Sequence, residues 1–247
     1  MSSTESAIRE KIYCAIDTPD MTRAGSLAAA LSGAIGGIKL GLEFFSANGP
    51  GGVRRVMDKA ADADLFLDLK FHDIPNTVAA AMRAVAPLGP RLINVHASGG
   101  KAMMEAAREA AMEGAEAAGV KPPRVLGVTV LTSLDGGDLQ GLGVPCEPVD
   151  QVLRLATLAA EAGLDGVVCS AREIAALRKA VGRDFLLVTP GIRPAGAEAA
   201  DQKRVVTPAE AIADGADYLV MGRPITGEPD PAEAVIRIAR QAAEAVA

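Results

Sequence analysis

The chain has 247 residues and a formal net charge of −6, and no basic cluster stands out along it. This acidic balance argues against nucleic acid as a partner, because following a phosphate backbone takes gathered lysines and arginines. No apolar run approaches the ~20 residues that cross a bilayer, and the first residues (MSSTESAIREK) hold no apolar core of a signal peptide. We therefore expect a cytoplasmic protein without membrane contact.

Three cysteines, Cys14, Cys146 and Cys169, are far apart in the sequence and form no C-x-x-C pair. An odd number without close spacing argues against a disulfide framework and against a zinc site. Cys14 and Cys169 lie inside apolar runs, so we expect both to be small core residues.

Short β-rich runs alternate with longer, alanine-rich helical runs along the whole chain. The β-rich runs have the length and the apolar character of buried parallel strands. They predict strands over residues 12–17, 37–43, 63–70, 92–97, 124–131, 166–170, 185–191 and 218–222. The helical patterns cover residues 21–31, 77–88, 100–118, 149–162, 171–181, 208–214 and 231–245.

This alternation predicts an α/β protein whose eight strands close into a (β/α)8 barrel of the TIM type. The length fits a single domain of this kind over residues 1–247. An open doubly wound sheet is the alternative, but it usually has a Gly-rich turn after the first strand, where this chain has Asp-Thr-Pro-Asp at 17–20. Two long segments, 133–150 and 193–206, follow strands and predict lids, with plain irregular crossings as the alternative.

Charged residues stand at the carboxyl ends of the apolar strands. Asp68 and Lys70 are two positions apart, so they share one face of their strand while the neighbouring leucines face the helices. Catalytic groups of barrel enzymes come from these strand ends, which favours catalysis over a buried ion-pair network that only closes the barrel. The charges expected to converge are Asp17, Lys39, Asp68 and Lys70, with Asp73 just beyond them in the loop.

The loops after the seventh and eighth strands of such a barrel often bind phosphate. Here they hold Arg193 and the pair Gly222-Arg223, in which the glycine lets a backbone amide approach an anion and the arginine offers a fork of donors. We expect Gln202, in the second long segment, to add a contact. The alternative is that Gly-Arg forms an ordinary surface turn.

The two histidines, His72 and His96, each lie near the end of a predicted strand. Their spacing matches no metal-binding pattern. We expect them to pack or to form hydrogen bonds, and we predict no metal site.

These residues together resemble the orotidine 5'-phosphate decarboxylase family, in the style of its bacterial branch, from residue 15 to residue 226. The most specific part is DLKFHDIPNT at 68–77, which looks like the family signature. The segments KLGLE at 39–43, LTS at 131–133, TPGIR at 189–193 and DQKRV at 201–205 also fit. The resemblance implies a barrel that decarboxylates orotidine 5'-monophosphate (OMP) to UMP and CO2, the last step of de novo UMP synthesis, with neither metal nor cofactor.

The resemblance also implies a role for each matching residue. Lys70 would protonate C6 of the pyrimidine, Asp68 would lie against the substrate carboxylate, and Lys39 and Asp73 would complete the charged chain. The remaining substrate contacts would be Asp17 and Lys39 to the ribose, Ser133 to the pyrimidine with Thr132 beside it, and Arg193, Gln202, Gly222 and Arg223 to the phosphate.

The family is further known for active sites that two chains share, so the resemblance implies a homodimer. Asp73, together with Ile74 and Thr77, would reach into the site of the partner chain.

Two other readings stay open. A Mg²⁺-dependent sugar-phosphate decarboxylase or aldolase of the same superfamily, acting on keto-gulonate phosphate or hexulose phosphate, shares the Asp-x-Lys-x-x-Asp core. The residues FHDIPNT at 71–77 and the segment 193–202 argue against it. A catalytically silent binding protein for a phosphorylated ligand would have no reason to keep Lys70 between two carboxylates.

Overall fold

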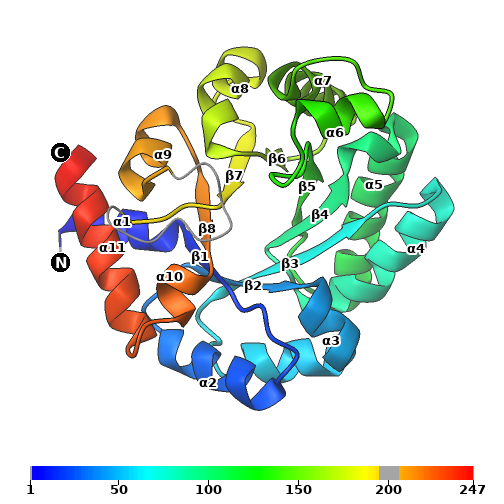
Figure 1. Cartoon of the computed structure of the whole chain (residues 1–247). Coiled ribbons are helices and arrows are strands. Elements are labelled where there is room, and N and C mark those ends of the chain that lie inside the picture. Colours follow the sequence, from blue (N-terminus) through cyan, green and yellow to red (C-terminus); the bar gives the residue numbers. More distant parts are fainter. Residues whose placement is uncertain (1, 195–205, 247) are drawn as a thin grey trace.

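The strands close into a parallel barrel with helices outside it, as Figure 1 shows for the computed structural model, which describes residues 2–194 and 206–246. Each strand pairs with the next one along the chain, and β8 pairs with β1 to complete the barrel. The predicted (β/α)8 architecture is confirmed. The strands are β1 (Ile12–Ala15), β2 (Gly37–Gly41), β3 (Asp64–Phe71), β4 (Leu92–His96), β5 (Arg124–Val128), β6 (Gly166–Val168), β7 (Leu186–Pro190) and β8 (Tyr218–Met221).

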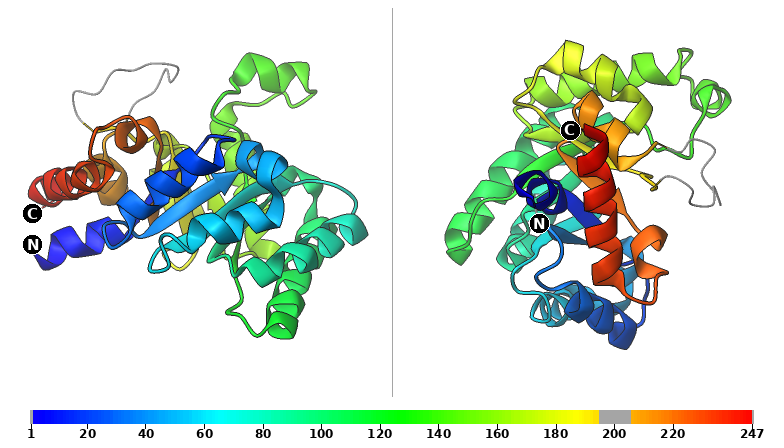
Figure 2. Two further views of the ribbon diagram at one scale, coloured as in Figure 1. Left: turned by 90° about the horizontal axis from the view of Figure 1, so that it is seen from below. Right: turned by 90° about the vertical axis from the view of Figure 1, so that its left-hand side faces the viewer.

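Helices form the outer layer, and α1 packs beside α11, so both ends of the described chain lie on the same side of the barrel (Figure 2). No helix in the described residues has both the length and the apolarity to span a membrane. The helices are α1 (Ser3–Glu10), α2 (Met21–Leu31), α3 (Leu42–Met57), α4 (Pro75–Val85), α5 (Lys101–Ala118), α6 (Gly136–Gly141), α7 (Pro148–Glu161), α8 (Ile174–Val181), α9 (Pro208–Asp214), α10 (Arg223–Thr226) and α11 (Pro231–Val246), with 3₁₀ turns at Ala86–Leu88, Ala97–Gly99 and Ala171–Glu173.

Two apolar layers meet at the barrel wall. Inside the barrel, Tyr13 and Phe66 belong to one buried cluster, whereas Leu65 and Leu67 belong to the larger core shared with the helices. This alternation follows from the two-residue period of a strand. It also decides the direction of Asp68, which lies two residues after Phe66 and therefore points to the barrel axis.

Most of the predicted strands extend beyond the observed ones at their carboxyl ends, whereas β3 ends at Phe71, one residue after its predicted end. β1 ends at Ala15 and β5 at Val128, so Asp17 and residues 129–131 lie in loops instead. The apolar pattern continues into these loops because their residues still line the mouth of the barrel. A strand and a buried loop therefore look alike in the sequence at these points.

Helix α3 is absent from the predicted helices, and its first residues fall within the predicted strand 37–43. Its interior contains Gly49, at φ 59°, followed by Pro50, and the two interrupt the helix. Both residue types disfavour a helix interior, so they conceal the helical period of the sequence. The prediction is wrong here because packing against the barrel outweighs local propensity.

The predicted lid at 133–150 is partly helical. It contains α6, which begins with a capping box in which Asp135 and Asp138 each accept a hydrogen bond from the other's backbone amide. This arrangement satisfies two amides that would otherwise lack partners at the helix start. In the other predicted lid, residues 195–205 lie outside the described residues.

All three cysteines are free thiols, and Cys14 and Cys169 are buried as predicted. Burial raises the pKa of each of these two thiols to about 12. Neither is a thiolate at neutral pH, so both act as small apolar core residues.

The barrel interior makes Gly37→Ala a costly change. A Cβ at Gly37, on β2, would overlap the ring of Tyr13. That ring is fully buried and packs edge-on against Tyr218, with 5.2 Å between ring centroids, so it has little room to move. We expect Gly37→Ala to lower the free energy of unfolding by about 1–3 kcal/mol, as measured by urea denaturation.

The matched control is Gly25→Ala, in helix α2, where a new Cβ meets nothing within 4 Å. Alanine is favoured over glycine inside a helix by roughly 0.5–1 kcal/mol, so this variant should be slightly more stable than the parent protein. Identical unfolding free energies for Gly37→Ala and the parent would contradict the close packing of Tyr13 on β2.

Candidate active site

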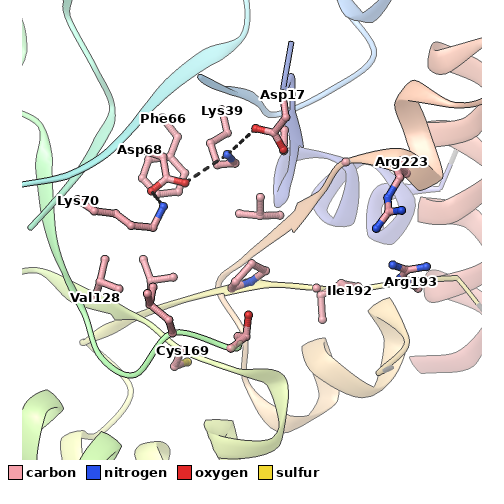
Figure 3. Close-up of a pocket in the computed structure, with 18 of the residues that line it drawn as sticks. Asp17, Lys39, Phe66, Asp68, Lys70, Val128, Cys169, Ile192, Arg193 and Arg223 are labelled. Carbon is pink, nitrogen blue, oxygen red and sulfur yellow. Dashed lines mark hydrogen bonds and ion pairs between the residues drawn. The ribbon is translucent and has the colours of Figure 1, made fainter. Parts of the chain in front are cut away.

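A cavity of about 340 Å³ opens at the carboxyl ends of the strands. Its walls come from strand ends and from the loops that follow them, as expected for a barrel enzyme (Figure 3). The predicted site residues that line it are Asp17, Lys39, Asp68, Lys70, Thr132, Arg193, Gly222 and Arg223.

Four charged side chains form a continuous chain along one wall of this cavity (Figure 3). The Lys39 ammonium lies 3.2 Å from an Asp17 oxygen and 3.2 Å from Asp68 Oδ2. The Lys70 ammonium lies 2.6 Å from Asp68 Oδ1. The predicted convergence of these four charges from three neighbouring strands is confirmed.

Asp68 is the centre of the chain and is only 8% exposed. Burial by itself would raise the pKa of this carboxyl, but the ammonium groups of Lys39 and Lys70 and a hydrogen bond from Asn94 hold the pKa below its usual value. Burial likewise works to lower the pKa of Lys39, yet Asp68 and Asp17 keep that pKa above the ordinary value. Both groups are therefore ionised at neutral pH, with alternating signs.

The backbone is unusual where it carries Lys70. Lys70 has φ 49°, the one positive value at a non-glycine residue in the described chain. The pairing of β3 with β4 shifts at the same place, since Leu67 pairs with Ile93 whereas Phe71 pairs with Val95. Residues with such backbone angles concentrate at functional sites, and here the kink accompanies a salt bridge back to Asp68.

Asn94 on β4 belongs to the site and is missing from the sequence prediction. It is completely buried and forms hydrogen bonds both to the backbone of Lys70 and to the side chain of Asp68. A signal did exist, because a lone polar residue stands in the apolar run Leu92–His96, on the same strand face as Leu92. Buried amides in such runs need partners, which points to a polar neighbour inside the barrel.

Two arginines lie across the cavity from Lys70 (Figure 3). Arg193 follows β7 and is mostly buried, and Arg223 follows β8 directly after Gly222. All three line the cavity, as predicted. The cavity thus has a charged chain of both signs at one side and guanidinium groups at the other.

Other predicted residues lie outside this cavity. Asp73, Ile74 and Thr77 are exposed, with Ile74 at 67%, and the Asp73 carboxylate accepts a hydrogen bond from the Ile74 amide at 2.6 Å. Within the described residues no ion pair joins Asp73 to Lys70 of the same chain. Ser133 is exposed and does not line the cavity, and Gln202 lies outside the described residues.

The two histidines lie next to each other, with 5.5 Å between ring centroids and a tilt of 39°. Burial lowers the pKa of His96, and the neighbouring His72 and Lys70 lower it further. The contact between the rings agrees with the packing role predicted for both. In residues 2–194 and 206–246, no three His, Cys, Asp or Glu side chains gather in a way that could hold a metal ion.

Comparison with known proteins gives consistent results. The chain matches the model of a family described as "Orotidine 5'-phosphate decarboxylase / HUMPS family" over residues 10–238. It is 61% identical over 228 residues to the orotidine 5'-phosphate decarboxylase of Rhodospirillum rubrum, with 92% of each chain covered. It is 53% identical over 234 residues to that of Moorella thermoacetica, with 94% of this chain and 92% of the relative covered.

A solved structure agrees with this at the level of the fold and the sequence. The crystal structure of orotidine 5'-phosphate decarboxylase from Lactobacillus acidophilus is 34% identical and superimposes with a TM-score of 0.79, covering 93% of this chain and 97% of that chain. The barrel, the charged cavity and the similarity over almost the whole sequence lead to one conclusion: the chain belongs to the orotidine 5'-phosphate decarboxylase / HUMPS family.

Proposed function

We propose that this chain is a cytoplasmic carboxy-lyase of pyrimidine biosynthesis that converts OMP to UMP and CO2. The observation that carries the proposal is the charge layout of one cavity, with Lys70 and Asp68 on one side and Arg193 and Arg223 on the other. OMP has a carboxylate on its base and a phosphate at its far end, so each anionic end meets cations in this cavity. The name shared by the similar bacterial proteins supports the same substrate.

Loss of CO2 from C6 of the pyrimidine leaves a carbanion at that carbon. In our proposal the Lys70 ammonium faces this carbon, stabilises the developing negative charge and then protonates it. The salt bridge to Asp68 at 2.6 Å supports this role because it fixes the direction of the ammonium group. Apolar side chains such as Val128 and Ile192 also line the cavity, and electrostatic stabilisation is stronger beside apolar groups than in bulk water.

Asp68 has a second proposed role, as a carboxylate placed against the carboxylate of the substrate. A like-charge contact of this kind disappears when CO2 leaves, so it raises the energy of bound substrate more than that of the transition state. The lowered pKa of Asp68 supports this role, since the group stays ionised despite its burial. Lys39 then balances the charge of Asp68 from the opposite side, at 3.2 Å.

The remaining proposed contacts follow the positions of the lining residues. Asp17 and Lys39, which form a salt bridge at the mouth, would bind ribose hydroxyls between the two charged ends. The guanidinium groups and the Gly222 amide suit a phosphate, which accepts several hydrogen bonds at once. We assign Thr132 and Ser133 to the pyrimidine, and Arg193, Gln202, Gly222 and Arg223 to the phosphate.

We also propose that the protein is a homodimer in which Asp73, Ile74 and Thr77 complete the site of the partner chain. Ile74 supports this proposal because it is a large apolar side chain with 67% of its surface exposed, at the start of α4. An apolar side chain in this position would lose contact with water if a partner chain covered it. Asp73 adds further support because it follows β3 directly, yet it is exposed and does not line the cavity of its own chain.

A mixed dimer of Lys70→Ala and Asp73→Asn chains tests this sharing of sites. Each variant should be inactive as a homodimer. A mixed dimer, isolated with two different affinity tags, should regain activity, because one of its sites combines Lys70 of one chain with Asp73 of the other. A mixed dimer as inactive as both homodimers would mean that Asp73 acts within its own chain.

The activity itself is tested by the ultraviolet absorbance of OMP after addition of the purified protein in excess EDTA. We expect the spectrum to change to that of UMP, and the change to be absent with Lys70→Ala. Turnover of a sugar phosphate in the presence of Mg²⁺, with no change in OMP, would move the protein to the metal-dependent reactions of the superfamily.

A further inference from the structure

Asn94 connects the two central residues of the charged chain although it does not line the cavity. Its side-chain oxygen accepts a hydrogen bond from the Lys70 backbone amide at 2.7 Å. Its side-chain nitrogen donates to Asp68 Oδ1 at 2.7 Å, the same oxygen that accepts from the Lys70 ammonium at 2.6 Å. Asn94 therefore contacts the backbone that carries the cation and the carboxylate that pairs with it.

An amide is the group that suits both of these partners. The Lys70 backbone N–H can only donate, and the ionised Asp68 carboxylate can only accept. An aspartate at position 94 would place an oxygen where a donor is needed, and a leucine of similar size would satisfy neither partner. Because Asn94 has no exposed surface, water has little access to replace a lost hydrogen bond.

The backbone conformation of Lys70 depends on the Asn94 side chain. With φ at 49°, Lys70 departs from the extended conformation of β3, and the strand loses its regular pairing with β4 between Leu67 and Phe71. The Asn94 side-chain oxygen accepts a hydrogen bond from the Lys70 backbone N–H at the position where regular pairing is interrupted. The hydrogen bond therefore stabilises a conformation that side chains other than glycine rarely adopt.

We propose that Asn94 is a positioning residue that holds Lys70 and Asp68 in their reactive geometry through its two hydrogen bonds. This inference rests on the proposed decarboxylation, because it concerns the direction of the proton donor in that reaction. Displacement of a catalytic group by about 1 Å can reduce a rate by about 10²-fold. Loss of Asn94 should therefore reduce kcat and leave the affinity for UMP, which depends on the distant arginines, nearly unchanged.

Two variants test the proposal by steady-state kinetics. We expect Asn94→Leu to reduce kcat by about 10²-fold at every pH, with little change in the dissociation constant of UMP. Asn94→Asp should show a similar loss at neutral pH, where its carboxylate would repel Asp68. As the pH falls, the new carboxyl takes up a proton and can donate to Asp68 as the amide does, so the kcat of this variant should recover relative to the parent enzyme.

The titratable groups on the elements that neighbour position 94 could also change kcat as the pH changes. They are Asp68 and Lys70 on β3, Lys39 on β2, Asp17 after β1, His96 on β4 and His72 after β3. All six are present in the parent and in both variants. If kcat recovers at low pH in Asn94→Asp but not in the parent or in Asn94→Leu, the introduced carboxyl is therefore the cause.

Asn48→Asp is the matched control for the exchange of an amide for a carboxyl. The Asn48 side chain donates to the backbone carbonyls of Pro19 and Phe44, at 2.9 and 3.2 Å, and lies outside the cavity lining. We expect this variant to lose stability without a kcat that recovers at low pH. Thermal unfolding of all variants shows whether each is folded at the assay temperature.

A measurement that needs no turnover is the pH titration of the Asp68 carboxyl carbon by ¹³C NMR. Removal of the donor in Asn94→Leu should move this titration to higher pH than in the parent. An unchanged titration together with parental kcat in both variants would overturn the inference. A parent protein without OMP turnover would overturn the proposed function instead, and the titration would still decide whether Asn94 positions Asp68.

Discussion

Lys70→Ala is expected to lower kcat for OMP by about 10⁴-fold or more. The change removes the proposed proton donor, and proton transfer from a positioned side chain typically accelerates a reaction by about 10²–10⁴-fold. It also removes the cation that would stabilise the carbanion. UMP should still bind, with a loss of affinity smaller than the loss of rate, because Arg193 and Arg223 on the other side of the cavity are unchanged. Single-turnover absorbance measurements and titration calorimetry with UMP check the two parts separately.

The control for this experiment is Lys179→Ala, which removes an exposed lysine from α8 outside the cavity lining. It should retain the kcat of the parent enzyme. A near-parental kcat in Lys70→Ala would exclude Lys70 as the proton donor. Equal losses of kcat and of UMP affinity would instead point to a collapse of the whole cavity.

Arg223→Ala has the second large expected effect, on binding rather than on chemistry. A hydrogen bond between charged groups contributes roughly 1.5–3 kcal/mol, so the dissociation constant of UMP should rise by about 10- to 100-fold. The affinity for uridine, which has no phosphate, should change little. Titration calorimetry with both ligands, at one fixed salt concentration, measures the difference.

Arg237→Ala is the matched control, because Arg237 lies on α11 with its guanidinium 3.2 Å from Glu228 and outside the cavity. It should leave the binding of both ligands unchanged. If Arg223→Ala weakens UMP and uridine by the same factor, its guanidinium does not bind the phosphate. The loop after β8 would then only support the shape of the cavity.

Much of the charged site could be predicted from the sequence, for local reasons. The two-residue period of a strand places Asp68 and Lys70 on one face and Leu67 and Leu69 on the other, and the structure agrees. The order of strands in a closed barrel then brings Lys39 and Asp17 alongside, because β1, β2 and β3 are neighbours. Neither step needs information beyond the nearest elements of the chain.

Other residues could not be placed in this way. Asp73, Ile74 and Thr77 lie outside the cavity of their own chain, so the fold of one chain does not place them in a site. Helix α3 was hidden by Gly49 and Pro50, whose local propensities oppose the helix that packing on the barrel stabilises.

The sequence by itself therefore determined the alternation of strands and helices, the barrel they predict, and the face on which Asp68 and Lys70 lie. Tertiary structure alone decided the left-handed backbone of Lys70, the 2.6 Å contact of its ammonium with Asp68, and the two hydrogen bonds of Asn94. The physical reason is that these features depend on how β3 and β4 pair, and strand pairing is set by packing between residues distant in the sequence.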